Sequence, residues 1–318
     1  MPSPLDAIRS LPLPKEKSLV GFSGGADSTA LLLALHLAGW PVSAVHFNHQ
    51  LRGASSTADA RYCRQFCKDR GIPFRCIRLD VLGSRQKGES LESCARRLRL
   101  EKWRELTSQK HQLVFLAHHG DDAAEELFLR ILRGGSSSGL TGLREYRVLE
   151  DGTRLARPLL HCRKSDLEEF LTSHGVLEWC LDETNSLPNC NRNRIRNLLL
   201  PWWRESFGGD SGIHATLEAL REDAAFLEEA ARSALPEKPD INDWRAIPDA
   251  LFPRVIRIRF HLAMPPSRET IARIKRELFA EHPGRNNLHI PIGEGKYLVL
   301  HHKKGLLEEK KPPASPRQ

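Results

Sequence analysis

The hexapeptide SGGADS, residues 23–28, carries the clearest chemical signal of the sequence. Apolar runs flank it, so the pattern predicts a turn between a buried strand and a helix. The backbone N–H groups of Gly24 and Gly25 can then point into one concavity at the positive end of the helix, which favours a phosphate. Asp27 stands where a Walker A loop has lysine, so a divalent cation would have to separate this acid from the phosphate. The alternative is an ordinary turn in which Asp27 and Ser28 cap the helix.

A second polar group, His118 to Asp122, begins another predicted helix. Asp122 and Glu125 are three residues apart, so their side chains lie on the same face of that helix. Two carboxylates in this arrangement could hold a metal ion or bind an ammonium group, and hard oxygen ligands suit Mg²⁺ better than zinc. The alternative is that these acids only stabilise the N-terminal end of the helix.

A segment rich in arginine and asparagine spans residues 191–197. Arg192, Arg194 and Arg196 can neutralise phosphates, and the intervening asparagines can bind the edges of bases. The alternative is the solvated, basic start of a helix. A separate stretch rich in glycine and serine, residues 132–142, predicts either a linker or a mobile lid over the site.

Strands and helices alternate along the first half of the chain. The predicted strands are 18–22, 41–47, 74–79 and 112–117, and the predicted helices are 28–35, 56–70 and 89–107. This alternation is typical of a doubly wound α/β fold with a parallel sheet, in which ligands bind beyond the carboxyl ends of the strands. Polar residues follow three of these strands, so we expect the segments 23–27, 46–52 and 118–122 to converge on one site.

The composition changes at Gly208, Gly209 and Asp210. We therefore predict an N-terminal catalytic domain over 1–209, a connecting amphipathic helix within 210–235 and a smaller α+β domain over 236–318. The last domain is expected to contain helices at 251–263 and 268–281, a hairpin of 289–292 with 296–302, and a tail from 303 that is frayed at its end.

Composition restricts the class of protein. The net charge of +8 suits a polyanionic partner such as nucleic acid. Seven cysteines, an odd number scattered along the chain, indicate reduced thiols in a cytoplasmic protein. No apolar run approaches the ~18 residues that a membrane span needs, so we expect a soluble protein without a membrane partner.

Taken together, these motifs resemble those of the tRNA(Ile)-lysidine synthetase family, within the superfamily of PP-loop ATP pyrophosphatases. SGGADS matches the PP-loop signature that the whole superfamily shares. The further matching segments are Asn48–Gly53, Glu92–Arg96, His118–Asp122 through Glu125, Arg157–Leu160, Asp182–Asn185 and Arg192–Arg196. The last three in this order are much more specific. The chain departs from the common pattern at Leu100, Ala123 and Glu126, and we expect it to lack the final C-terminal domain of longer members.

The resemblance implies a two-step ligation. ATP adenylates the carbonyl oxygen at C2 of the wobble cytidine of an isoleucine tRNA with a CAU anticodon, and free lysine then displaces AMP to form lysidine. The implied cofactors are ATP and Mg²⁺, the domain over 1–209 becomes the ATP-binding catalytic domain, and the domain over 236–318 is expected to bind tRNA.

The expected roles of the residues are as follows. ATP would be bound by Ser23, Gly24, Gly25, Ala26, Asp27, Ser28 and His46, with Asp27 also holding Mg²⁺. Catalysis is assigned to Asp27, Arg96, Asp122 and Glu125, and substrate binding to Asp122, Glu125, Arg194 and Arg196. The pair Asp122 and Glu125 would recognise lysine. In the competing interpretation Asp122 joins Asp27 on the metal and Glu125 only supports the helix.

Two other classes of function stay open. A tRNA thiolase of the same superfamily would need paired catalytic cysteines or an iron–sulfur cluster, and the sequence has no Cys-x-x-Cys. A non-enzymatic RNA-binding protein would release no pyrophosphate. The oligomeric state, with a homodimer as one option, is also open.

Overall fold

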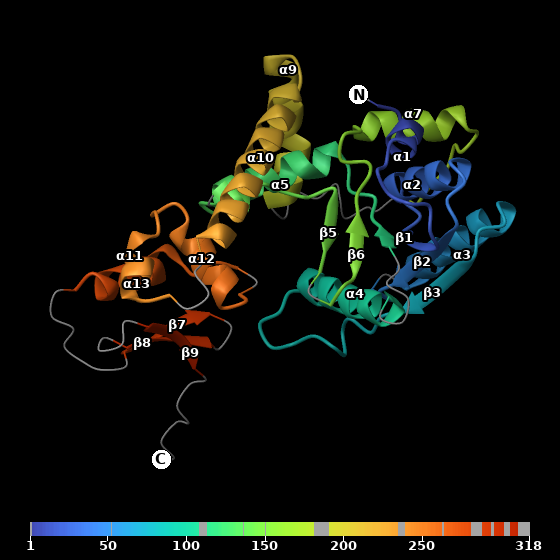
Figure 1. Ribbon diagram of the computed structural model, residues 1–318. Coiled ribbons are helices and arrows are strands. Elements are labelled where there is room, and N and C mark those ends of the chain that lie inside the picture. Colours follow the sequence, from blue (N-terminus) through green and yellow to red (C-terminus); the bar gives the residue numbers. More distant parts are fainter. Residues whose placement is uncertain are drawn as a thin grey trace. The chain divides into compact units, whose positions relative to one another are not determined.

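The computed structural model describes residues 2–51, 53–107, 113–135, 137–149, 151–180, 191–234, 239–262, 264–280, 288–293, 296–301 and 306–310 (Figure 1). The chain divides into two compact units, 1–218 and 219–318. This division falls within the long helix α10, Ser211–Ser233. Three predictions, the boundaries at 209 and 235 and the motif Asp182–Asn185, remain predictions, and that motif lies outside the described residues.

The first unit is built on a six-stranded sheet with the order β3-β2-β1-β4-β6-β5. Its strands are β1 Ser18–Gly21, β2 Val42–Asn48, β3 Phe74–Arg78, β4 Leu113–Phe115, β5 Tyr146–Val148 and β6 Arg154–Ala156. All neighbours pair in parallel except β5 with β6, which are antiparallel. The predicted α/β fold is therefore confirmed. The hairpin of β5 and β6 at the edge of the sheet was not predicted, because each of its strands has only three residues.

The centre of the sheet is β1, because this strand pairs with β2 on one side and with β4 on the other. Ser18 lies opposite Val42 in one strand and Leu113 in the other. The chain builds β1, β2 and β3 outward and then returns to the far side of β1 for β4. The order thus reverses between β1 and β4, and such a reversal opens a crevice at the carboxyl ends of the strands.

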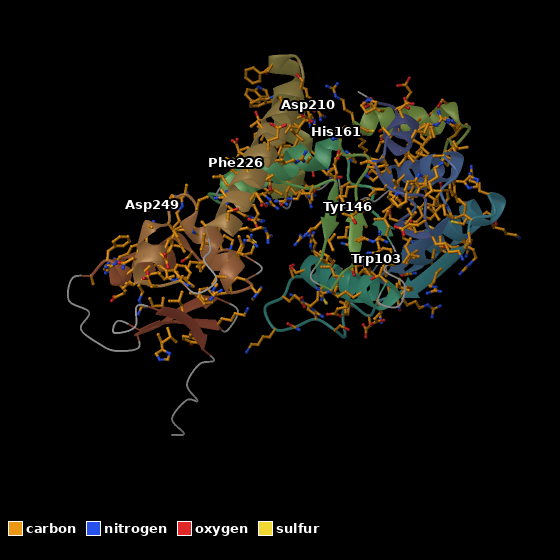
Figure 2. The ribbon with its side chains drawn as sticks, viewed as in Figure 1. Trp103, Tyr146, His161, Asp210, Phe226 and Asp249 are labelled. Atoms are coloured by element: carbon orange, nitrogen blue, oxygen red, sulfur yellow. The ribbon has the colours of Figure 1, made fainter. Side chains whose placement is uncertain are left out.

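Helices cover both faces of this sheet, as Figure 1 shows for α2 and α7 on one side and α4 on the other. The helices of the unit are α1 Pro4–Arg9, α2 Ala26–Leu37, α3 Ala54–Asp69, α4 Leu91–Thr107, α5 Gly120–Leu132, α6 Ser137–Leu140, α7 Lys164–Ser173, α8 Asn191–Arg194, the π-helix η2 Ile195–Leu199 and α9 Leu200–Phe207. Residues of α1, α2, α3 and α7 share one apolar core. On the opposite face Trp103 of α4 (Figure 2) packs edge-on against Phe47, with ring centroids 4.9 Å apart. Both faces are buried, as the nearly continuous apolar strands require.

The second unit has its own core around Trp244, Phe252 and Ile274. Its helices are α11 Ile241–Ala246, α12 Phe252–Arg259 and α13 Arg268–Leu278, and its antiparallel sheet consists of β7 Leu288–Gly293, β8 Lys296–His301 and β9 Leu306–Lys310. The sequence analysis predicted the hairpin of β7 and β8 but placed β9 in the tail. No strand was predicted within 306–310, because pairing with β8 orders a segment whose own residues do not alternate. Across the described ranges, no helix combines the length and apolar character that crossing a membrane requires.

Candidate active site

The loop between β1 and α2 is shaped by its own serines. Ser28 Oγ accepts from the backbone N of Ser23 over 3.1 Å and lies 3.0 Å from Ser23 Oγ. Gly25 is the N-cap of α2, and no side chain in the described part of the loop caps it. The first turn, which begins at the buried Ala26, thus keeps backbone N–H groups for an anion.

Gly24 is a position that only glycine fits. Its φ is +88°, and a Cβ there would lie 2.8 Å from Cys180 Sγ and 3.0 Å from Cys63 Sγ. The backbone N of Cys180 donates to the carbonyl of Gly24 over 2.9 Å. Two cysteines that are far apart in sequence therefore pack against the phosphate loop, which the sequence analysis did not anticipate.

His46 supports this loop from β2. Its Nδ1 donates to the carbonyl of Phe22 over 2.9 Å, and its side chain is almost fully buried. Burial lowers the pKa of His46, despite the opposing effects of that hydrogen bond and of Asp59. The contact positions the loop, and a direct contact of His46 with ATP stays a prediction.

His119 lies between two acids at the end of β4. Its Nε2 is 3.6 Å from Asp27 Oδ2 and 3.6 Å from Asp122 Oδ2, and its backbone N donates to Asp122 over 3.1 Å. Burial lowers the pKa of His119, but Asp27, Asp122 and Asp121 together raise it to about 9. The buried His119 side chain therefore joins the loop after β1 to the loop after β4, across the reversal of strand order. The HHGDD motif contained this histidine, but only the fold shows that it bridges both acids.

Asp27 is ionised and has an unused oxygen. Burial raises its pKa, but His119, Lys164 and Arg196 together lower the pKa below its ordinary value. Its Oδ1 is buried and has no hydrogen-bond partner among the described residues. No set of three or more His, Cys, Asp and Glu side chains in the described part of the chain could hold a metal by itself. One carboxylate completed by substrate phosphates and water is how Mg²⁺ is usually bound, so Asp27 fits that ion.

Glu125 is fully buried and holds two arginines. Its Oε2 accepts from Arg192 Nε over 3.1 Å and from Arg196 Nη2 over 3.0 Å, and its Oε1 accepts from Arg196 Nε over 2.5 Å. Arg196 Nη2 also donates to Asp122 Oδ1 over 3.3 Å. Asp122 and Glu125 therefore lie on the same face of α5, and Asp122 is the more accessible carboxylate, with 14% of its side chain exposed.

The π-helix η2 begins at Ile195, the residue between the two predicted substrate-binding arginines. Arg196 turns toward the acids of α5, whereas Arg194 lines a cavity of about 410 Å³. The other lining residues are Leu132, Asn191, Ile195, Leu198, Leu199 and Trp202. An exposed tryptophan beside an arginine and an asparagine is suited to a stacked base.

Arg96 is exposed on α4, and its charge reaches the region after β4 and β6. It lowers the pKa of His118, as do Arg157 and Arg192, after the larger effect of burial. The fold therefore brings Asp27, Asp122, Glu125 and Arg196 together, and directs Arg194 to the neighbouring cavity.

A second charged network fixes the start of α10. Arg204 donates to Asp121 Oδ1 over 2.8 Å and to Asp210 Oδ2 over 2.6 Å, and Arg163 donates to Asp210 Oδ1 over 3.0 Å. The Asp210 side chain, labelled in Figure 2, is fully buried. Burial raises its pKa, but Arg204 and Arg163 bring the pKa below its ordinary value. The adjacent acid of the HHGDD motif, Asp121, is thus used for structure.

Comparison with known proteins agrees with this geometry. A family model described as a PP-loop domain matches residues 5–203. Proteins named tRNA(Ile)-lysidine synthase are similar: that of Bacillus subtilis is 34% identical over 224 residues, which are 68% of this chain and 47% of the relative, and that of Chromobacterium violaceum is 37% identical over 224 residues, 68% and 49%. The chain thus spans about half the length of these relatives.

The structure of U34-tRNA thiolase NcsA from Methanococcus maripaludis with its [4Fe-4S] cluster is also similar. It has a TM-score of 0.56 and 15% sequence identity, over 69% of this chain and 78% of that protein. At this identity the match supports the fold alone.

Proposed function

The chain belongs to the PP-loop domain family, and we propose that it uses ATP to attach lysine to C2 of the wobble cytidine of an isoleucine tRNA with a CAU anticodon. The observation that carries the proposal is the placement of Asp27 and Asp122 around His119, at the reversal of strand order. It puts a phosphate loop and an acid that could bind an amine in one crevice. The names of the relatives support the choice of reaction.

In the first step the cytosine O2 attacks the α-phosphate of ATP, and pyrophosphate leaves. The amides of Gly24 and Gly25 and the hydroxyls of Ser23 and Ser28 would bind the phosphates. Asp27 would hold Mg²⁺, which supplies positive charge against the phosphates when bound. Arg96 would neutralise charge that develops on the transferred group.

In the second step an amine of lysine forms a bond to C2, and the bond from C2 to the adenylated oxygen breaks, which releases AMP. The amine of lysine has an ordinary pKa of ~10.4, so it must lose a proton. Asp122 can bind the ammonium and accept that proton, because it is partly exposed. Glu125 would act by positioning Arg196, whose guanidinium suits the carboxylate of lysine.

The RNA would lie over the Arg194 cavity, with a base stacked on Trp202. The net charge of +8 favours this partner. The second unit, 219–318, is proposed to hold the tRNA away from the wobble base.

Mass spectrometry of nucleosides tests the proposal. Isoleucine tRNA treated with the protein, ATP, Mg²⁺ and lysine should yield lysidine, and omission of lysine or the variant Asp27→Asn should yield none. Consumption of ATP with an unchanged cytidine would refute the lysine step while leaving an adenylating enzyme.

A tRNA thiolase is the second candidate, because Cys63 and Cys180 both pack against Gly24. Burial raises the pKa of the Cys63 thiol strongly, which disfavours the thiolate that sulfur transfer needs. A double variant, Cys63→Ser with Cys180→Ser, should therefore retain lysidine formation. If this variant no longer modifies tRNA, and the protein without these substitutions produces a thionucleoside, the thiolase would be favoured.

A further inference from the structure

Arg157 is a buried cation at the carboxyl end of β6. Only 8% of the residue is exposed. Its Nη1 donates to the carbonyl of Arg144 over 2.9 Å, and its Nε is buried without a hydrogen-bond partner among the described residues. The motif that contains it, Arg157–Leu160, has no role in the reaction proposed above.

The charges around Arg157 are also positive. Burial lowers the pKa of its guanidinium, and the nearby charges of Arg147 and Arg96 lower it further, to about 10. His118, at the end of β4, is affected by the same group: burial, Arg157, Arg192 and Arg96 outweigh Asp122 and lower its pKa to about 4. The Nδ1 of His118 is buried and likewise has no partner within the described residues.

Two other arginines of this unit are balanced by acids. Arg196 binds Glu125 and Asp122, and Arg204 binds Asp121 and Asp210. A buried charge without a counter-charge is unfavourable. In the part of the chain that the structure describes, Arg157 therefore lacks a counter-charge that a bound anion would supply. Its planar guanidinium can bind two oxygens of a phosphate at once.

We propose that Arg157 forms a phosphate-binding subsite separate from the SGGADS loop. The SGGADS loop follows β1 and Arg157 follows β6, with β4 between these two strands. The ends of β1 and β6 are therefore two strand spacings apart, or about 10 Å. At that distance the subsite can receive either a phosphate of ATP or a phosphodiester of the RNA. The existence of the subsite depends on its geometry alone, whereas these two sources of phosphate rest on the proposed function.

Arg157→Met separates a ligand-binding role from a structural one. The methionine fills similar space without charge, so the ligand-free variant should melt at the same temperature as the unmodified protein or higher. Added inorganic pyrophosphate should raise its melting temperature less than that of the unmodified protein. Arg254→Met is the matched control, because Arg254 is also 8% exposed and also donates Nη1 to a backbone carbonyl, but lies in the second unit. This control should keep the full pyrophosphate shift.

Two binding titrations identify the source of the phosphate. If ATP supplies it, the dissociation constant of ATP without RNA should rise about 10-fold in Arg157→Met, and that of tRNA should not change. If RNA supplies it, tRNA affinity should fall without ATP, with a salt dependence weaker by about one phosphate contact. Arg157→Lys, which keeps the charge and loses the fork, should show a smaller defect and serves if the methionine variant does not fold.

The proposal is overturned if both ligands bind Arg157→Met as tightly as the unmodified protein and the pyrophosphate shift is equal. A wrong proposed function would give a different result. The tRNA treated with the protein, lysine and ATP would then contain no lysidine, while the Arg157 variants would still bind phosphate more weakly.

Discussion

Replacing Glu125 with glutamine tests whether this acid positions the arginines of the site. The carboxylate is fully buried and accepts three hydrogen bonds, one from Arg192 and two from Arg196. Glutamine has almost the same shape, but its amide NH₂ would face guanidinium N–H groups. If that NH₂ takes the place of Oε2, two of the three hydrogen bonds are lost.

The cost can be estimated from these contacts. A hydrogen bond to a charged group contributes about 1.5–3 kcal/mol, and removing one partner of a buried pair costs about 3–5 kcal/mol. The unit spans residues 1–218, and for such a size each kcal/mol lowers the melting temperature by about 2–4 °C. Glu125→Gln should therefore melt about 6–20 °C lower and weaken both the release of pyrophosphate and the use of lysine, because Arg196 loses its anchor.

Two neighbouring variants are the controls. Glu126→Gln weakens a half-buried pair with Arg130 one turn away and a longer pair with Arg192 at 3.9 Å, and it should change stability by less than about 1 kcal/mol. Asp122→Asn weakens a 3.3 Å contact with Arg196 and the charge pair with His119, so it should melt less far below the unmodified protein than Glu125→Gln does but require at least about 10-fold more lysine. The assay measures pyrophosphate release and lysidine formation against lysine concentration. A Glu125→Gln protein with unchanged melting and a selectively raised lysine requirement would refute the positioning role and assign lysine binding to Glu125 itself.

Three further predictions follow from the structure. Asp27→Asn should abolish tRNA-dependent pyrophosphate release. Its circular dichroism spectrum should stay nearly unchanged, because the residue lies in the first turn of α2. Full pyrophosphate release by this variant would exclude Asp27 as the Mg²⁺ ligand. The pKa of Asp210 is lowered, so the stability that this residue contributes is present above its ordinary pKa of 3.8 and is lost as the pH falls through its lower pKa in the folded state. In denaturant titrations the protein should be more stable than Asp210→Asn by about 3–5 kcal/mol at neutral pH, and this difference should shrink below pH 3.8. A difference that stays constant with pH would contradict the pairing with Arg204. Trp202→Ala should weaken tRNA binding by about 1–3 kcal/mol and leave ATP binding unchanged, and equal tRNA affinity in an anisotropy titration would remove the stacking role.

Some features of the fold could be read directly from local patterns. The apolar runs at 18–22, 41–47 and 74–79 match β1, β2 and β3 to within one residue at each end. Buried strands are continuous and apolar, and glycine or polar residues end them, so neighbouring residues hold this information. The short strands β5 and β6 have three residues each. They form because β6 pairs with β4 and β5 pairs with β6, which no local pattern predicts.

The candidate residues divide in the same way. The types and spacing of SGGADS and of Asp122 with Glu125 predicted a phosphate loop and an acidic helix face, because a turn and a helix place near neighbours in known directions. The partners of these residues come from distant parts of the chain. Glu125 meets Arg192 and Arg196 across 67 and 71 residues, and Gly24 meets Cys63 and Cys180.

Local patterns were therefore enough to predict the α/β class, the position of the loop and the acids of the helix α5. The contacts of Glu125 with arginines, the position of His119 between Asp27 and Asp122, and the burial of Arg157 among positive charges became visible only in the folded chain. The physical reason is that hydrogen bonding within helices and turns acts over a few residues, whereas charge pairing and burial depend on which segments the packed sheet brings together.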